Sequence, residues 1–118
     1  MEDKKKWKLV KSNTEYDCKR FKVNRDIVLL PNGFKTEYLY IFKSPAIMVV
    51  PVLDKDQLVL VKQYRYIVDI FSLEFPAGGI KDGESSENAA YRELLEETGY
   101  AAEKIKLMNK VYTSNGNT

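Results

Sequence analysis

The chain has 118 residues, of which 44% are hydrophobic and 31% are charged, and its formal net charge is +2. This composition is ordinary for a globular protein, and so small a charge argues neither for nor against a polyanionic partner. The absence of histidine excludes a histidine-ligated zinc site and a nucleophile activated by histidine, and the single cysteine, Cys18, excludes an internal disulfide.

Cysteine usage and hydropathy also bear on location. A single cysteine suits a reducing cytosol. The longest apolar run, residues 46–53, is too short to cross a bilayer and contains Pro51. No stretch has the pattern of a signal peptide. We therefore expect a cytoplasmic protein without membrane attachment, and we also expect no nucleic-acid partner.

The N-terminal part of the chain has the patterns of β-structure. Residues 8–11 and 16–23 look like strands, and the second has no wholly apolar face, which favours an edge strand. Residues 26–30 are apolar, residues 31–33 read Pro-Asn-Gly, and residues 34–42 alternate between two faces. Two strands joined at Pro-Asn-Gly predict a β-hairpin.

This predicted hairpin has more aromatic surface than a short hairpin hides alone, and a second subunit is one natural cover. Three aromatic residues of the N-terminal β region are candidates for stacking on a nucleotide base, although packing in a core or an interface is the favoured role. They are Tyr16, Phe21 and Tyr38.

The next segments predict a sheet. Residues 45–53 read as a buried strand, residues 54–57 as a turn and residues 58–63 as the next strand. Residues 104–113 predict a further strand beyond a helix. This order of elements indicates a mixed sheet with a helix packed on it.

The stretch from Gly78 to Tyr100 contains that helix. Ser85 is a candidate N-cap, and Gly99 lies where a glycine commonly ends a helix. One face combines residues that we expect to pack on the core. They are Tyr91, Leu94, Leu95 and Thr98.

Three carboxylates lie on the neighbouring face of the same helix. Glu93, Glu96 and Glu97 are spaced i, i+3 and i+4, and like charges at this spacing cost roughly 0.2–0.5 kcal/mol each. We expect Arg92 to offset one of these charges at most. A hard divalent cation such as Mg²⁺ or Mn²⁺ would offset the others. The glycine-rich loop at residues 76–83 would let the backbone approach a metal or a phosphate closely.

The spacing of these residues resembles a known motif. Gly78, five residues, Glu84, seven residues and then the run Arg92–Tyr100 match the Nudix box in full. A chance match is on the order of one in 10⁸ per starting point. Enzymes of the Nudix family hydrolyse a nucleoside diphosphate linked to another group, with a divalent metal ion. The resemblance therefore implies a metal-dependent pyrophosphohydrolase.

The resemblance also implies a fold and roles for residues. It implies an α+β fold, a Nudix-type α/β/α sandwich around a mixed sheet, for residues 45–118, with an antiparallel β-hairpin region at residues 1–44. The implied ligands of Mg²⁺ or Mn²⁺ are Glu93, Glu96, Glu97 and the carbonyl of Ala77. Roles in catalysis fall to Glu84, Arg92, Glu96 and Glu97, with Arg92 orienting the glutamates through a pair with Glu84.

Two further segments are similar to the ADP-ribose pyrophosphatase branch of the family. They are residues 61–65 and residues 73–78. In that branch an arginine at the position of Arg65 contacts the substrate, and guanidinium suits phosphate oxygens. Three roles are open for Glu74. It contacts the substrate, it supports a residue that contacts the substrate, or it is simply a carboxylate at the end of a strand. We place Arg65, Glu74 and Gly78 in the substrate site.

The branch similarity implies a reaction and an assembly. The reaction is hydrolysis of ADP-ribose or a similar nucleoside diphosphate sugar to AMP and ribose 5-phosphate. The general base that activates water is Glu96, Glu97 or a residue of a segment that family members have beyond residue 118. The implied assembly is a homodimer through the N-terminal strands. Two alternatives remain open, which are another nucleotide substrate for the same chemistry and a non-catalytic nucleotide-binding module.

The sequence departs from the branch in two places. Residues 114–116 read Ser-Asn-Gly where the branch usually has Ser-Pro-Gly. Family members also continue with further strands, a loop with an extra glutamate and a closing helix, so we expect residues 45–118 to be an incomplete Nudix domain. A sheet edge and apolar surface would then be exposed. We accordingly expect poor solubility or obligate assembly.

Overall fold

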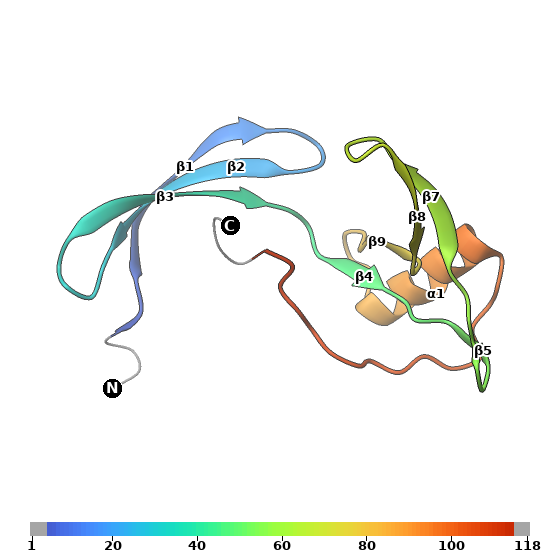
Figure 1. The fold of residues 1–118 in the computed structure, drawn as a ribbon. Helices are drawn as coiled ribbons and strands as arrows, with labels where there is room; N and C mark the ends of the chain where they lie inside the picture. The colour runs from blue at the N-terminus through green and yellow to red at the C-terminus, as the bar shows by residue number, and fades with distance from the viewer. Residues whose placement is uncertain (1–4, 115–118) are drawn as a thin grey trace. The chain divides into compact units, whose positions relative to one another are not determined.

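The computed structural model describes residues 5–114 of the chain. The chain divides into two compact units. Among the described residues, the first contains residues 5–44 and 112–114, and the second is Pro45–Val111. Figure 1 shows their helix and strands. Of the Ser-Asn-Gly run at residues 114–116, only Ser114 lies within the described residues.

The first unit contains a three-stranded antiparallel sheet in the order β1-β2-β3. Its strands are β1 (Lys8–Asp17), β2 (Lys22–Leu29) and β3 (Lys35–Phe42). The hairpin predicted at Pro-Asn-Gly is confirmed. The N–H of Leu30 donates to the carbonyl of Phe34 at 2.8 Å, and Gly33 has a φ of +89°, which glycine adopts without steric cost.

The strand predicted over residues 16–23 is wrong. β1 runs on from Lys8 to Asp17, and the chain then turns, with the N–H of Cys18 donating to the carbonyl of Phe21 at 3.0 Å. Residues 16–23 have no apolar face that would fix a strand, so the short turn is free to form between two longer paired strands. Every residue of β1 is exposed, and β1 is an edge of this sheet.

Aromatic rings pack across this sheet. The ring of Trp7 lies edge-on to that of Tyr38 at 5.9 Å between centroids, and Tyr38 in turn lies 6.3 Å from Tyr40. Tyr16 and Phe21 pack against each other at 5.9 Å on either side of the β1–β2 turn. The three aromatic residues considered for base stacking therefore each lie against another ring of the same unit.

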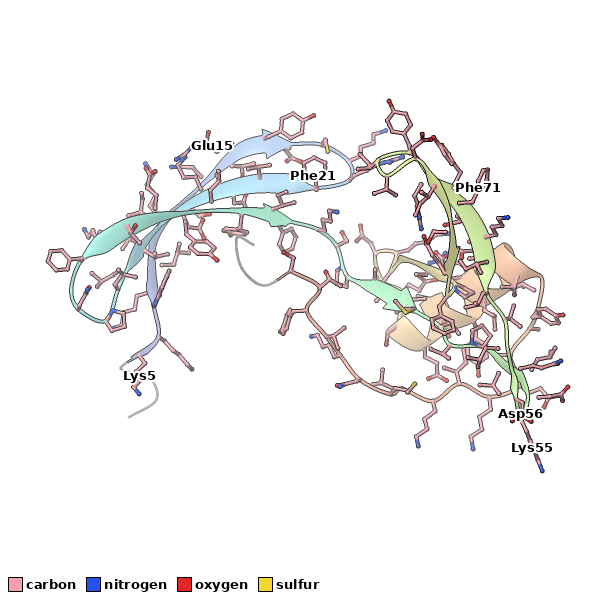
Figure 2. The ribbon with its side chains drawn as sticks, in the orientation of Figure 1. Lys5, Glu15, Phe21, Lys55, Asp56 and Phe71 are labelled. Atoms are coloured by element: carbon pink, nitrogen blue, oxygen red, sulfur yellow. The ribbon has the colours of Figure 1, made fainter. Side chains whose placement is uncertain are left out.

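The second unit contains three two-stranded antiparallel ladders. They are β4 (Ala46–Met48) with β9 (Ala77–Gly79), β5 (Val52–Asp54) with β6 (Gln57–Leu58), and β7 (Val61–Arg65) with β8 (Ile70–Glu74). The predicted turn is present, with Lys55 and Asp56 at its tip (Figure 2).

Two strands of this unit differ from their predicted bounds. The strand expected over residues 45–53 is divided into β4 and β5, because the buried Pro51 has no N–H to donate to a ladder. The strand expected over residues 58–63 is divided in the same way, since β6 ends at Leu58 and β7 begins at Val61.

The helix α1 (Ser86–Thr98) packs against β4 and β9 (Figure 1). Both predicted caps are confirmed. The side chain of Ser85 accepts from the N–H of Asn88 at 3.1 Å, and the N–H of Gly99, at φ +76°, donates to the carbonyl of Leu95 at 2.9 Å.

The face of α1 that is buried differs from the predicted face by a rotation about the helix axis. Ala89, Ala90 and Leu94 are buried, whereas Leu95 is 53% exposed. Each residue advances the helix by about 100°, so Leu95 lies well away from the direction of Leu94. The prediction that Leu95 packs on the core was therefore wrong.

The strand predicted over residues 104–113 is also wrong, because no described strand forms a ladder with this extended segment. The expected exposed apolar surface is present. On the segment beyond α1, Leu107, Met108 and Val111 are each more than two-thirds exposed. Among the described residues, no helix is long and apolar enough to cross a membrane.

Candidate active site

The glycine-rich loop before α1 holds Glu84 in a fixed position. The backbone N–H of Lys81 donates to Oε1 of Glu84 at 3.1 Å, and the N–H of Glu84 donates to the carbonyl of Lys81 at 3.0 Å. Gly83 has a φ of +76°, which closes this turn with little strain. The loop therefore presents the Glu84 carboxylate to the helix.

The Glu84 carboxylate accepts two hydrogen bonds from Arg92, from Nε at 2.8 Å and from Nη2 at 2.8 Å. Arg92 also donates to Glu93 at 2.7 Å, to Glu96 at 3.3 Å and to the carbonyl of Gly79 at 3.0 Å. Arg92 thus contacts two carboxylates of the helix face as well as Glu84, and its single positive charge is shared among the three. We call these five residues the Arg92 network.

Burial and charge reinforce this network. The side chains of Arg92, Glu84 and Glu93 are 19%, 15% and 12% exposed. The hydrogen bonds from Arg92, followed by that from the Lys81 N–H, lower the pKa of Glu84 from 4.5 to about 2. The Glu84 and Glu93 carboxylates raise the pKa of Arg92. The pair therefore stays ionised over a wide pH range.

Gly78 makes room for Glu93. A Cβ atom at Gly78 would overlap the Glu93 carboxylate, with Oε2 only 2.6 Å away, whereas a Cβ at Gly79 would meet nothing within 4 Å. A Cβ atom at position 78 would displace the Glu93 carboxylate from its observed place against β9. The sequence predicted a close approach of a ligand at this glycine, and the structure places a protein carboxylate there.

A second charged pair lies on the β7–β8 hairpin. Nε of Arg65 donates to Oε2 of Glu74 at 2.9 Å, and Nη2 makes a short bond to Oε1. This hydrogen bonding from Arg65 lowers the pKa of Glu74 to about 2. The bonds to Glu74 chiefly raise the pKa of Arg65, and the charge of Glu97 adds to that effect. Arg65 is thus within electrostatic range of helix α1.

The structure brings together most, though not all, of the predicted site residues. Glu97 on α1 is half-buried and has no side-chain hydrogen bond within residues 5–114, and Ala77 on β9 is exposed. Across the same residues, no three acidic or cysteine side chains are grouped closely enough to hold a metal ion. The roles of Glu93, Glu96, Glu97 and Ala77 as metal ligands stay predictions.

Two backbone groups that hold Arg92 and Glu84 in place were not predicted from the sequence. They are the carbonyl of Gly79, which accepts from Arg92, and the N–H of Lys81, which donates to Glu84. The three-residue separation of Lys81 and Glu84, around glycine, is the signal that predicts such a turn. The Gly79 contact depends on how β9 packs on α1, so no local signal predicts it.

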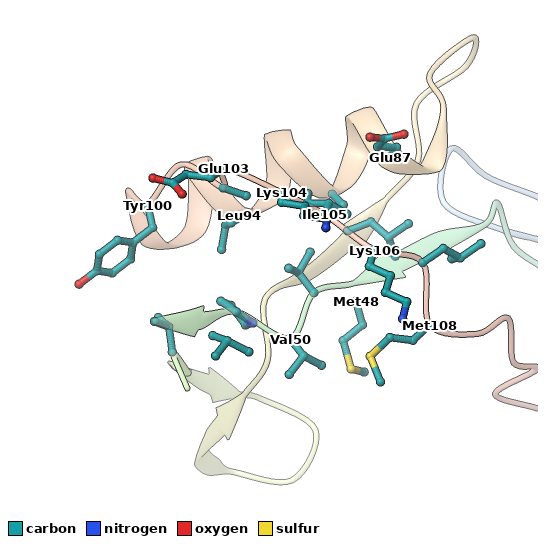
Figure 3. Close-up of a pocket in the computed structure, with 18 of the residues that line it drawn as sticks. Met48, Val50, Glu87, Leu94, Tyr100, Glu103, Lys104, Ile105, Lys106 and Met108 are labelled. Atoms are coloured by element: carbon teal, nitrogen blue, oxygen red, sulfur yellow. The ribbon is translucent and has the colours of Figure 1, made fainter. Parts of the chain in front are cut away.

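A groove of about 1200 Å³ lies on another face of the helix (Figure 3). It is lined by β4 and β5, by residues 101–109 and by Glu87, Ala90 and Leu94 of α1. Since Glu93, Glu96 and Glu97 are not among its lining residues, the groove is separate from the carboxylate face.

Comparisons with known proteins identify the family. The sequence model of the NUDIX domain matches residues 26–117. The ADP-ribose pyrophosphatase of Bacillus subtilis (strain 168) is 43% identical over 90 residues, which are 75% of this chain and 48% of that protein. The methanol dehydrogenase activator of Bacillus methanolicus is 32% identical over 109 residues, which are 92% of this chain and 59% of that protein.

A solved structure is also similar. The crystal structure of an ADP compounds hydrolase has a TM-score of 0.72 and 31% identity, and the match covers 84% of this chain and 54% of that one. The expected α+β Nudix fold and the likeness to ADP-ribose pyrophosphatases are confirmed. The chain spans about half the length of these relatives. A match over residues 26–117 nonetheless shows that the chain belongs to the Nudix family.

Proposed function

We propose that this chain forms part of a Nudix pyrophosphohydrolase that cleaves ADP-ribose or a similar nucleoside diphosphate sugar to AMP and ribose 5-phosphate. The observation that carries the proposal is the Arg92 network, in which a loop glutamate and an arginine hold a helix carboxylate in space left by Gly78. The similarity to an ADP-ribose pyrophosphatase and to an ADP compounds hydrolase supports this class of substrate.

The donor atoms of the predicted ligands are of the type that a hard divalent cation prefers. Glu93, Glu96, Glu97 and the carbonyl of Ala77 offer only oxygen atoms, which Mg²⁺ and Mn²⁺ prefer. The missing Cβ at Gly78 supports the fit, because it lets Glu93 approach the strand that carries Ala77. When bound, such a cation would neutralise charge on the pyrophosphate and make water a stronger nucleophile at neutral pH.

The chain's own residues have separate tasks in this proposal. Arg92, fixed by Glu84, holds Glu93 and Glu96 in place. Arg65 binds phosphate oxygens through its planar guanidinium. Glu96 or Glu97 accepts, at a carboxylate oxygen, the proton that water loses as its oxygen bonds to one phosphorus. The P–O bond on the other side of that phosphorus breaks, and AMP and ribose 5-phosphate separate.

Assembly and location are part of the same proposal. Residues 1–44 would form a dimerising β region and residues 45–118 the Nudix domain. The exposed edge strand β1 and the exposed Ile41 and Phe42 of β3 support an interface there. Sedimentation should then show a dimer, and a sharp monomer peak with cooperative melting would contradict it. The cytoplasmic location predicted from the single cysteine stays a prediction.

Two assays run side by side test the function. The chain is incubated with Mg²⁺ and with ADP-ribose, ADP-glucose or NADH, and release of AMP is measured. Calorimetry of ADP-ribose binding with Mg²⁺ is done on the same preparation. AMP release that is fastest from ADP-ribose supports the proposal. Faster release from another substrate changes its substrate class, and binding without release favours a non-catalytic nucleotide-binding module.

A further inference from the structure

Arg65 and Glu74 meet although they lie at opposite ends of the β7–β8 ladder. The register places Arg65 opposite Ile70 and Glu74 opposite Val61. Residues that oppose each other share a face, so Arg65 and Glu74 are on the same face, four register positions or roughly 13 Å apart along the strands. Their side chains must extend toward each other along this face to form the observed bonds.

This geometry moves the guanidinium away from the hairpin turn. Glu74 is the last residue of β8, and the chain continues through the fully buried Pro76 to Ala77 and β9. The N–H of Val49 donates to the carbonyl of Pro76 at 2.8 Å, which anchors this end of the strand. Glu74 therefore holds the guanidinium toward the strand that borders the helix carboxylates, in agreement with the contribution of Glu97 to the pKa of Arg65.

The pairing leaves one edge of the guanidinium available. Glu74 accepts from Nε and Nη2, and within residues 5–114 no oxygen accepts from Nη1. The Arg65 side chain is 53% exposed. In Arg92, by contrast, all three nitrogen atoms donate to protein oxygens. A guanidinium has two edges that match two oxygens, so the second edge of Arg65 is free to meet a phosphate.

We propose that Glu74 is a positioning residue, which contacts no substrate itself but holds Arg65 by one edge so that the Nη1–Nη2 edge binds a phosphate of the substrate. The inference rests on the proposed function, because it assigns the cause of phosphate binding within that site. In this proposal Glu74 does not contact the substrate directly. It affects substrate binding only by holding Arg65.

A double-mutant cycle tests this dependence. The variants are Glu74→Gln, Arg65→Ala and the double variant, and calorimetry measures their affinity for inorganic pyrophosphate with Mg²⁺. Arg65→Ala should weaken binding about tenfold to a hundredfold, the range for hydrogen bonds to charged groups. Glu74→Gln should weaken it several-fold to about tenfold in the wild-type background and not at all in the Arg65→Ala background.

The controls keep the result interpretable. Glu37 on β3 forms an exposed ion pair with Arg25 at 2.8 Å. Glu37→Gln removes the charge from this pair and should leave the affinity for pyrophosphate unchanged. Melting temperatures are recorded for every variant. If Glu74→Gln does not fold, Glu74→Asp, which keeps the charge but shortens the side chain, enters the same cycle.

The possible outcomes separate the two proposals. Equal losses from Glu74→Gln in both backgrounds, no loss in the wild-type background, or no pyrophosphate binding by the wild-type chain would each overturn the positioning role. Turnover of ADP-ribose by the wild-type chain is measured separately. If the wild-type chain does not turn over ADP-ribose, the proposed hydrolysis fails. The positioning role would still stand if Glu74→Gln weakens pyrophosphate binding in the wild-type background and not in the Arg65→Ala background.

Discussion

The Arg92 and Arg65 pairs use the same chemistry in two different surroundings. Each arginine donates two hydrogen bonds to a glutamate, and each lowers the pKa of that glutamate to about 2. Arg92 is 19% exposed and has every nitrogen engaged, whereas Arg65 is 53% exposed and has one nitrogen available. An arginine thus serves to organise carboxylates when it is enclosed and to bind a ligand when one edge is open.

The largest expected effect concerns Glu97, whose charge reaches Arg65 from the helix. Replacing Glu97 by Gln keeps the shape but removes a proposed metal ligand and base. We expect the turnover of ADP-ribose to fall at least about a hundredfold while circular dichroism stays unchanged. Glu87→Gln, an exposed change on the same helix, is the control and should keep its turnover. Near-normal turnover of Glu97→Gln would remove Glu97 from the site.

A smaller loss is expected when the space beside the Arg92 network is filled. Gly78→Ala places a methyl group on the Glu93 carboxylate, so either Glu93 or β9 must shift. We expect turnover to fall about tenfold or more, since misplacing a group by about 1 Å is costly. Gly79→Ala meets nothing within 4 Å and is the matched control. Equal kinetics for the two variants would mean that the position of Glu93 does not matter.

Lysine at each arginine position separates the two regions directly. Arg92→Lys keeps the charge but cannot bind Glu84 by two bonds while also reaching Glu93, so the melting temperature should fall by several degrees. Arg65→Lys changes an exposed pair, so the melting temperature should stay within about 1 °C while KM for ADP-ribose rises. The opposite pattern, with stability lost at Arg65, would reverse our assignment of the two arginines.

The smallest effect is a change in how stability depends on pH. The folded pKa of Glu84 is about 2, below its ordinary value of 4.5, so its contribution is complete above about pH 4.5 and is lost as the pH falls toward 2. Denaturant unfolding from pH 5 to pH 2 should therefore show a weaker pH dependence in Glu84→Gln than in the wild type. The same slope in both proteins would show that Glu84 and Arg92 are not paired in solution.

The sequence predicted those features that depend on neighbouring residues. The caps of α1 follow from Ser85 and Gly99, and the hairpin follows from Pro31–Gly33. Features that need a distant partner were predicted poorly. Residues 104–113 have an apolar pattern, but a strand exists only when another strand pairs with it, and none of the described strands does.

The site shows the same division. The spacing of Glu84, Arg92 and Glu93 identified the box, and the structure brings these side chains together. Sequence alone could not show that Arg65 reaches Glu74, because this pairing depends on the β7–β8 register. It also could not show that Gly78 faces Glu93, because that contact forms only when the helix packs on β9.

The most direct test is anomalous diffraction from crystals of the chain grown with Mn²⁺ and ADP-ribose. We predict an anomalous peak bound by Glu93, Glu97 and the Ala77 carbonyl, with the pyrophosphate beside it and Arg65 on a phosphate oxygen. Ordered ADP-ribose without any manganese at these carboxylates would contradict the account.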